Sequence, residues 1–247
     1  MNRSIFLILT VILFSLSCSP PQQAVTLNYT GYRIEKGAPT DTAMANFLLP
    51  YSTAMNATMN RVIGFTSESM TSKQPESALG NLMADCMRSM AEKKFGKKVD
   101  AGFMNPYGIR SYIPKGNITV GKVYELMPFD NLVVLQEMKG SVFKKFLDKV
   151  AADGGWPVSE GVLIRIKDKK AVSILINGQP LNEEALYTIA NSDYIANGGD
   201  NCDMLRSVPQ QNKGYVLRDA IIEYINQFTQ QGKPVEAKIE NRVTHVN

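Results

Sequence analysis

Three short segments of the sequence carry residue types that can recognise a ligand. They are Asn105-Pro-Tyr-Gly-Ile-Arg110, Met127-Pro-Phe-Asp-Asn131 and Tyr194-Ile-Ala-Asn-Gly-Gly-Asp200. An asparagine offers a hydrogen-bond donor and an acceptor, and an arginine offers a planar fork that suits phosphate or carboxylate oxygens. Because binding residues are often carried on loops at strand ends, Asn105 and Arg110 are candidates for contact with a polar ligand. The alternative is a surface turn with a solvated arginine.

The other two segments combine aromatic rings with polar groups. Pro128 fixes the backbone before Phe129, which stands at a turn rather than in an apolar period, and Asn131 follows. A nucleobase can stack on such a ring, and Tyr194 offers a second one. Asp200 ends a glycine turn and can accept from two adjacent ribose hydroxyls. The three segments together predict a nucleoside sandwich; singly, the ring could plug the core and the turn could be a hairpin or a weak cation site.

Catalytic chemistry has few candidate residues. His245 is the only histidine in the sequence. Metal-assisted phosphoester hydrolysis needs two ions about 3.5–4 Å apart, held by several His, Asp and Asn ligands. Nucleophile pairs of the Ser-His and Cys-His types are excluded for the same reason. We therefore predict no catalytic residue, no metal ligand and no cofactor bound by this chain.

The cysteines give a second exclusion. Cys86 belongs to a helical apolar stripe, and Glu92 lies six residues after it. A cysteine phosphatase needs an exposed thiolate with an arginine several residues further on, so we predict a buried structural thiol. Pairing of Cys86 with Cys202 is left open by the sequence.

The first residues have the features of a secretory signal. Arg3 precedes an apolar run, residues 5–16, that is too short to span a bilayer as a stable helix. The stretch Leu16-Ser-Cys18-Ser19 resembles a bacterial lipoprotein cleavage site. We predict a signal peptide over 1–17 and a lipoprotein anchored to the membrane through lipidated Cys18, on the periplasmic side or at the cell surface. Ordinary signal cleavage and an uncleaved anchor are the alternatives.

Composition bounds the rest of the chain. Removal of residues 1–17 would leave 230 of the 247 residues, enough for one sizeable domain with an extension. The formal net charge of the whole sequence is +4. No block of Lys and Arg and no interleaving of aromatic and basic residues favours nucleic acid, so we expect no nucleic-acid partner.

Helical periodicity predicts four helices. Asp41 is a plausible N-cap for the first, and Pro50 is expected to kink or break it. The second begins near Glu76 and has a single buried stripe. That stripe consists of Leu79, Leu82, Met83, Cys86, Met87 and Met90. Shorter amphipathic patterns over residues 143–150 and 217–228 predict the other two, the last ending before Gly232 and Pro234.

Four runs rich in β-branched and aliphatic residues predict strands. They cover residues 99–104, 132–136, 162–166 and 172–176, and the first ends just before Asn105. The last two read as a hairpin, which argues against an all-parallel sheet. We predict an α+β fold, a mixed β-sheet with helices packed on it. The predicted organisation is a lipid-anchored tether and leading strand over 18–40, then one domain with an N-terminal linker helix over 41–247.

The chain from about Arg61 to Phe228 resembles the C-terminal, substrate-binding domain of the 5′-nucleotidase family. The matching pieces include Glu76-Ser-Ala-Leu-Gly-Asn81, the segment 116–121 and the turn Gly198-Gly-Asp200. The resemblance implies that two aromatic residues clamp the base, that an aspartate holds the ribose, and that an asparagine and an arginine lie near the phosphate and ribose. The implied substrate-binding residues are Asn105, Arg110, Phe129, Asn131, Tyr194 and Asp200.

The chain also departs from the family pattern. Pro106 and Tyr107 stand where the family loop usually has glycines, Tyr194 replaces the commoner phenylalanine, and Lys73 stands near the place of another family arginine. The resemblance implies the nucleotide-binding half of a split 5′-nucleotidase in nucleotide catabolism, with divalent metals held only by a separate metallophosphatase chain. The alternatives are a stand-alone nucleoside-binding lipoprotein without a hydrolase role and a degenerate domain kept for assembly.

Overall fold

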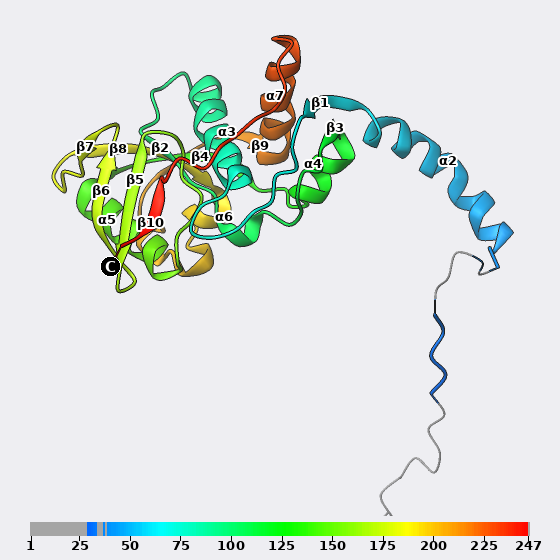
Figure 1. The fold of residues 1–247 in the computed structure, drawn as a ribbon, viewed down its shortest axis with the longest axis horizontal. Helices are drawn as coiled ribbons and strands as arrows, with labels where there is room; N and C mark the ends of the chain where they lie inside the picture. Colours follow the sequence, from blue (N-terminus) through cyan, green and yellow to red (C-terminus); the bar gives the residue numbers. More distant parts are fainter. Residues whose placement is uncertain (1–28, 34–36, 38, 247) are drawn as a thin grey trace, which may run out of the picture. The chain divides into compact units, whose positions relative to one another are not determined.

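The computed structural model of the protein describes residues 29–33, 37 and 39–246 (Figure 1). The predicted signal peptide over 1–17, Cys18 and most of the tether lie outside the described residues. Residues 29–33, the described part of the expected leading strand, form no strand. The chain divides into Met1–Phe47 and Leu48–Asn247. Within the described residues, no helix combines the length and apolar character needed to cross a membrane.

Helix α2 (Thr42–Met59) confirms the first helical prediction. Asp41 Oδ1 accepts from the backbone N–H of Met44 at 3.1 Å, so the N-cap is as expected. The sequence predicts a kink or a break at Pro50; because Pro50 lies inside one continuous helix, there is no break. Proline withholds a single N–H, which leaves the carbonyl of Asn46 without its helical partner. Because α2 has no buried residue, that carbonyl is open to water.

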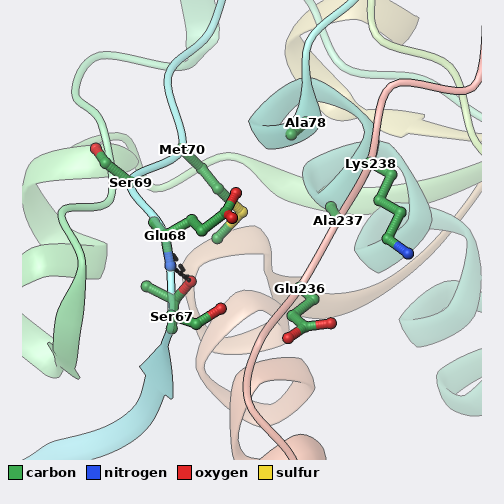
Figure 2. A pocket seen from close by; sticks show the side chains of 9 residues that line it. Ser67, Glu68, Ser69, Met70, Ala78, Glu236, Ala237 and Lys238 are labelled. Atoms are coloured by element: carbon green, nitrogen blue, oxygen red, sulfur yellow. Dashed lines mark hydrogen bonds between the residues drawn. The ribbon is translucent and has the colours of Figure 1, made fainter.

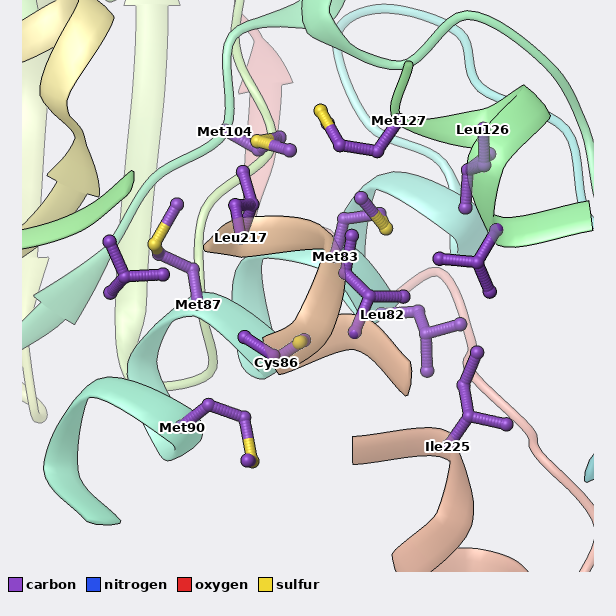
Figure 3. Packing of buried hydrophobic residues seen from close by; sticks show 14 of the residues in the cluster. Leu82, Met83, Cys86, Met87, Met90, Met104, Leu126, Met127, Leu217 and Ile225 are labelled. Carbon is purple, nitrogen blue, oxygen red and sulfur yellow. The ribbon is translucent and has the colours of Figure 1, made fainter. Parts of the chain in front are cut away.

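Helix α3 (Ala78–Phe95) forms the centre of one hydrophobic core. Ser77 Oγ caps its start by accepting from Gly80 N, and Gly96 ends it in the left-handed conformation at φ 68°. The whole predicted stripe is buried. Figure 3 shows its side chains meeting those of Met104, Met127 and Leu217 from other segments. Methionine adapts to irregular gaps, which suits a core where several elements meet.

The central sheet has the strand order β2 (Ala101–Gly102), β8 (Leu186–Ser192), β4 (Leu132–Lys139), β9 (Gln210–Val216). β2 runs parallel to β8, whereas β8 and β9 are both antiparallel to β4. This mixed sheet confirms the α+β prediction. The predicted strand over 99–104 is shortened to β2 and an isolated bridge from Phe103 to Val158.

The structure also contains two further sheets. One has the order β10 (Val243–His245), β5 (Val162–Lys167), β6 (Lys170–Ile176), β7 (Gln179–Pro180), and its antiparallel pair β5–β6 is the predicted hairpin. The other pairs β1 (Val62–Thr66) with β3 (Gly116–Thr119). The prediction of a hairpin between residues 162 and 176 is therefore confirmed.

The central sheet separates two cores because successive strand side chains point to opposite faces. Ile189 of β8 packs in one buried cluster and its neighbour Ala190 in the other. The cluster of Ala190 includes buried side chains of α3, α4 (Val120–Leu126) and α7 (Leu217–Gln230). The cluster of Ile189 includes α5 (Gly140–Ala152) and the buried Trp156. The helices predicted over 143–150 and 217–228 are thus confirmed.

The two described cysteines lie in different cores. Cys86 and Cys202 are both free and buried, and they belong to the clusters on opposite sides of the sheet. Burial, with Asp85 and Glu223 nearby, raises the pKa of the Cys86 thiol far above its usual range. Burial likewise raises the pKa of Cys202 to about 12. The prediction that Cys86 is a buried thiol is confirmed, and neither thiol is in the thiolate form that a nucleophile requires.

Candidate functional site

The pairing of the central sheet brings the three predicted segments to one edge. Asn105 follows the end of β2, and Tyr194 follows the end of β8, which is parallel to β2. Asn131 immediately precedes β4, which is antiparallel to β8, so the start of β4 lies where β8 ends. In the register, Val133 of β4 stands opposite Ser192 of β8. Segments far apart in sequence therefore meet at one strand end, the usual place for a binding site in a sheet.

The hollow at this edge has a volume of about 270 Å³. Its lining residues include all six that the sequence predicts for substrate binding. They are Asn105, Tyr107, Gly108, Arg110, Phe129, Asn131, Tyr194 and Asp200. The predicted residues are thus neighbours in space, while their role in binding stays a prediction.

Tyr107 is the lining side chain that sequence reasoning missed. It belongs to the short 3₁₀ helix η1 (Pro106–Gly108), and 70% of its surface is exposed. From the sequence, Tyr107 is distinguished only as a departure from a glycine loop. The sequence does contain a signal for a ring displayed at the site. Tyr107 lies between a proline and a glycine, a pattern typical of a turn, as at Phe129.

Asp200 is the centre of a hydrogen-bond network in the hollow. Tyr194 Oη donates to Asp200 Oδ1 at 2.9 Å, and Asn105 Nδ2 donates to Asp200 Oδ2 at 2.8 Å. The backbone N–H of Asp200 donates in turn to Tyr194 Oη at 3.3 Å. A carboxylate has about four acceptor positions, so both oxygens keep capacity for a further donor.

The tyrosine hydroxyl is held as a donor by this network. Its bond to the Asp200 carboxylate raises the pKa of Tyr194 above the ordinary value of 10.0, and the backbone N–H of Asp200 offsets part of that rise. Tyr194 therefore keeps its proton at neutral pH. The carboxylate, unlike the hydroxyl, has no proton to give, so the direction of the bond is fixed.

Two glycines allow the close contacts of the network. A Cβ on Gly199 would lie 2.5 Å from the ring of Tyr194, and one on Gly108 would lie 2.6 Å from Asn105 Oδ1. Such distances force the neighbour to move, so any larger residue would displace Tyr194 or Asn105. Asp200 itself has a left-handed φ of 50°, which aspartate tolerates better than most residues.

Asp193 fixes the backbone between the two aromatic segments. Its Oδ1 accepts from the backbone N–H groups of Leu132 and Tyr194, both at 2.9 Å. It thereby joins the start of β4 to the short helix α6 (Asp193–Ala196) that carries Tyr194. Because one carboxylate holds both segments, the positions of Asn131 and Tyr194 are coupled.

Arg110 and Phe129 form the other wall. The Arg110 guanidinium carbon lies 5.8 Å from the centre of the Phe129 ring, and Arg110 Nη1 donates to the carbonyl of Tyr107 at 3.3 Å. Residue Phe129 is 40% exposed and residue Tyr194 is 46% exposed. Arg110 is the only cation among the lining residues and Asp200 the only carboxylate. The hollow can thus offer two aromatic faces, one positive group and one negative group.

A second hollow differs from the first in chemistry. Figure 2 shows it beside the segment after β1 and the chain near Lys238, with a volume of about 170 Å³. Glu68, Glu236 and Lys238 supply its charges, and its lining contains no aromatic ring. Within the part of the chain that the structure describes, no group of three His, Cys, Asp or Glu residues could hold a metal ion. The second hollow therefore lacks the aromatic faces that the hollow at the strand ends offers to a flat ring.

Comparison with known proteins identifies the family. Residues 55–207 match the family described as 5′-nucleotidase, C-terminal domain. This match covers more than half of the chain, and the fold agrees with it. The chain belongs to the 5′-nucleotidase C-terminal domain family.

Relatives are longer proteins. "Protein UshA" of Salmonella pullorum is 32% identical over 143 residues, which are 56% of this chain and 25% of that protein. "5′-nucleotidase" of Vibrio vulnificus is 27% identical over 213 residues, 82% of this chain and 37% of that protein. The "Trifunctional nucleotide phosphoesterase protein YfkN" of Bacillus subtilis is 26% identical over 208 residues, 76% of this chain and 14% of that protein. The matched region thus spans well under half of each relative.

A solved structure supports the same assignment. The 5′-nucleotidase precursor from Thermus thermophilus superposes with a TM-score of 0.71 at 28% identity, covering 85% of this chain and 44% of that chain. The NAD nucleotidase of Haemophilus influenzae shares the fold, with a TM-score of 0.62 at 18% identity over 83% of this chain and 41% of that chain. The predicted family and fold class are confirmed.

Proposed function

We propose that this protein binds a nucleoside or nucleotide in the hollow at the strand ends. The base lies between Phe129 and Tyr194, the ribose hydroxyls donate to Asp200, and the 5′ side of the ligand faces Arg110. The observation that carries this proposal is the presence of two exposed aromatic rings and an aspartate in one hollow. Stacking on an aromatic side chain contributes about 1–3 kcal/mol per base in single-stranded nucleic-acid sites.

The environment of Asp200 supports a role for its carboxylate in binding. Its two described partners, Tyr194 and Asn105, are neutral donors, so its negative charge is not cancelled by a cation. Hydrogen bonds to a charged group are worth about 1.5–3 kcal/mol, more than those between neutral groups. Two adjacent ribose hydroxyls would fill the acceptor positions that remain.

We propose further that this protein supplies the substrate-binding half of a split 5′-nucleotidase, acting in nucleotide catabolism. A separate metallophosphatase chain would hold the divalent metals and hydrolyse the phosphoester. The residues of the matched domain support this division of roles, because residues 55–207 contain no histidine and two-metal sites need several ligands. The mechanism would be positional: the base and ribose are held here, and the phosphate is presented to metals of the partner.

Helix α2 offers apolar surface for such a partner. Leu48, Leu49 and Met55 are exposed, and α2 has no buried residue. Exposed apolar side chains grouped on one helix are typical of interaction surfaces. Lipidation of Cys18 would place this protein on a membrane, where a partner anchored to the same surface has a raised effective concentration.

A stand-alone nucleoside-binding lipoprotein is the second candidate. The charges of the hollow favour it, because Arg110 is the only cation in the lining and supplies a single positive charge for a phosphate. A nucleotide-binding site usually supplies more than one cation or backbone donor to the phosphate. The two candidates therefore differ in whether the phosphate adds to affinity.

Calorimetric titration separates these candidates. Adenosine, uridine, their 5′-monophosphates and ribose 5-phosphate would be titrated into the wild-type protein and into Asp200→Ala. We expect both nucleosides to bind, ribose 5-phosphate to bind poorly, and the variant to lose affinity. Equal affinity for nucleoside and monophosphate would favour the stand-alone binder. Absence of binding by any of the five compounds would refute the proposed function.

Phosphate release tests the split enzyme. We expect the purified protein to release no phosphate from adenosine 5′-monophosphate with added Mn²⁺ or Zn²⁺. Addition of a lone metallophosphatase from the same genome should produce release that depends on both chains. The variant Asp200→Ala, purified in the same way, controls for contaminating phosphatase. Metal-dependent turnover by the wild type alone, if absent from that variant, would contradict the split-enzyme hypothesis. A metallophosphatase that is fully active alone, and that is not stimulated by addition of this protein, would contradict it as well.

A further inference from the structure

The turn that carries Phe129 is held by an arginine outside the hollow. Arg218, the second residue of α7, donates through Nη1 to the carbonyl oxygens of Met127 at 3.3 Å and Phe129 at 3.1 Å. Its Nη2 donates to Asp130 Oδ1. Three acceptors of one four-residue turn are therefore bonded to one side chain.

The Arg218 guanidinium also contacts an aromatic ring outside the turn. Its central carbon lies 4.2 Å from the centre of the Tyr124 ring, which belongs to α4. Only 12% of the Arg218 side chain is exposed, whereas the Asp130 side chain is 85% exposed. Arg218 is thus stacked on an aromatic face and enclosed, while its exposed partner adds a charge-assisted bond.

The residue before Arg218 is hydrogen-bonded to the C-terminal end of the same segment. Leu217 N donates to the carbonyl of Asn131 at 2.8 Å. The side chain of Leu217 belongs to the same buried cluster as Met127 (Figure 3). The first turn of α7 therefore holds the segment from Met127 to Asn131 at both ends, and this segment brings Phe129 and Asn131 to the hollow.

The geometry suits arginine and not lysine. Two nitrogens reach three oxygens in different directions while the flat face rests on a ring. Lysine has a single compact ammonium group, so it cannot repeat this fork and has no planar face to stack. A substitution that keeps the charge would still release the turn.

We propose that Arg218 is a positioning residue, which orients the Phe129 ring for stacking without touching the ligand. Its consequence for binding rests on the proposed function. The orienting role itself does not, since it concerns the free protein. Two experiments therefore separate the two claims.

The first experiment needs no ligand. Protein labelled with 4-fluorophenylalanine would give a ¹⁹F resonance for Phe129, assigned by its loss in Phe129→Leu. We expect one resolved, shifted resonance in the wild type, because Arg110 lies over the ring. It should move towards the position of the free amino acid, or broaden, in both Arg218→Met and Arg218→Lys. An unchanged resonance in either variant contradicts the proposal.

The matched control is Arg88→Met. Arg88 also donates to two backbone carbonyls, those of Val99 and Glu160, at a place outside the hollow. It should leave the Phe129 resonance unchanged. Should Arg218→Met fail to fold, Asp130→Ala removes one of the three bonds at an exposed side chain and should produce a smaller change in the same direction. No change in Asp130→Ala would then count against the proposal.

The second experiment measures affinity. Arg218→Met should lower the affinity for a nucleoside and for its 5′-monophosphate by the same factor. The loss should not exceed that of one whole stacking face, which is about 5- to 150-fold. In Phe129→Ala, adding Arg218→Met should cause little further loss, because the ring that it orients is gone. A loss confined to the monophosphate and rescued by Arg218→Lys would show that Arg218 acts by its charge, which overturns the proposal. If the wild type binds neither ligand, the proposed function fails and the ¹⁹F result alone decides the role of Arg218.

Discussion

Two aspartates of this protein each accept hydrogen bonds on both carboxylate oxygens, but from partners of different charge. Asp85 Oδ1 and Oδ2 accept from the Arg242 guanidinium at 2.7 and 2.9 Å. Asp200 accepts from the neutral groups of Tyr194 and Asn105. In the described part of the chain, Asp200 has no ion-pair partner comparable to Arg242.

This difference separates a structural cluster from the proposed binding site. Arg242 is buried and also donates to the carbonyl of Val158 and to Glu240, so it joins α3, the loop before β5 and the C-terminal segment. Its charge and that of Asp85 largely cancel. Asp200 has only neutral side-chain donors as partners, and it lies in a hollow lined by aromatic residues. A carboxylate without a cationic partner can still accept charge-assisted hydrogen bonds from a ligand, whereas the Asp85 carboxylate is already paired with Arg242.

The largest effect is expected in the structural cluster. Arg242→Met should lower the free energy of unfolding by about 3–5 kcal/mol, because it leaves a carboxylate without its buried partner. Urea denaturation measures the loss. Glu240→Gln is the control, since that side chain is half exposed and its ion pair is worth at most about 1 kcal/mol. Equal losses in the two variants would contradict the assignment of Arg242 as the stabilising centre.

The next largest effect is expected at Asp200, on ligand affinity and not on stability. Asp200→Asn should weaken ribonucleoside binding by about 1.5–3 kcal/mol, because ribose hydroxyls lose a charged acceptor. The free energy of unfolding should change by less than about 0.5 kcal/mol, and asparagine tolerates the left-handed φ. Titration with a 2′,3′-dideoxynucleoside supplies the control, since it should bind wild type and variant alike. A variant that loses stability and keeps its affinity would make Asp200 a structural residue like Asp85.

Removal of one stacking face tests the aromatic walls. Phe129→Ala and Tyr194→Ala should each weaken nucleoside binding by about 1–3 kcal/mol while the melting temperature is kept. Both rings are partly exposed, so little core packing is lost. Val172→Ala removes a comparably exposed apolar side chain from β6 and serves as the control. A collapse of the melting temperature with unchanged affinity would show that the rings belong to the core.

The smallest effect should come from one hydroxyl. Tyr194→Phe keeps the ring and removes the donor to Asp200, so nucleoside affinity should fall by about 0.5–1.5 kcal/mol, less than in Tyr194→Ala. Calorimetry on the two variants side by side measures the difference. A gain in affinity would mean that the hydroxyl competes with the ribose for Asp200 instead of orienting it.

The sequence by itself determined the elements that have a local pattern. The helical stripe of α3, α7 and the β5–β6 hairpin were all predicted, because 3.6-residue and two-residue periods report which face is buried. It also determined six of the residues that line the hollow, through motifs that resemble the family. The fold class followed from these elements.

Other strands of the central sheet are formed only through tertiary pairing. β8 and β9 were not predicted, although β8 lies between β2 and β4. The sequence of β9, Gln210-Gln-Asn-Lys-Gly-Tyr-Val216, is polar and lacks a strand period. β8 and β9 are strands because they pair with neighbours far away in the chain, and pairing of that kind leaves no local signal.

The same limit applies to the site. Six residues were predicted, but the bonds that join Asn105 and Tyr194 to Asp200, the presence of Tyr107 and the hold of Arg218 on the Phe129 turn were not. Arg218 and Phe129 are 89 residues apart. A sequence specifies residue types and local periods, whereas distances between such segments depend on strand register and on the packing of two cores. The chemistry was therefore readable from the chain, and its geometry was decided by the fold.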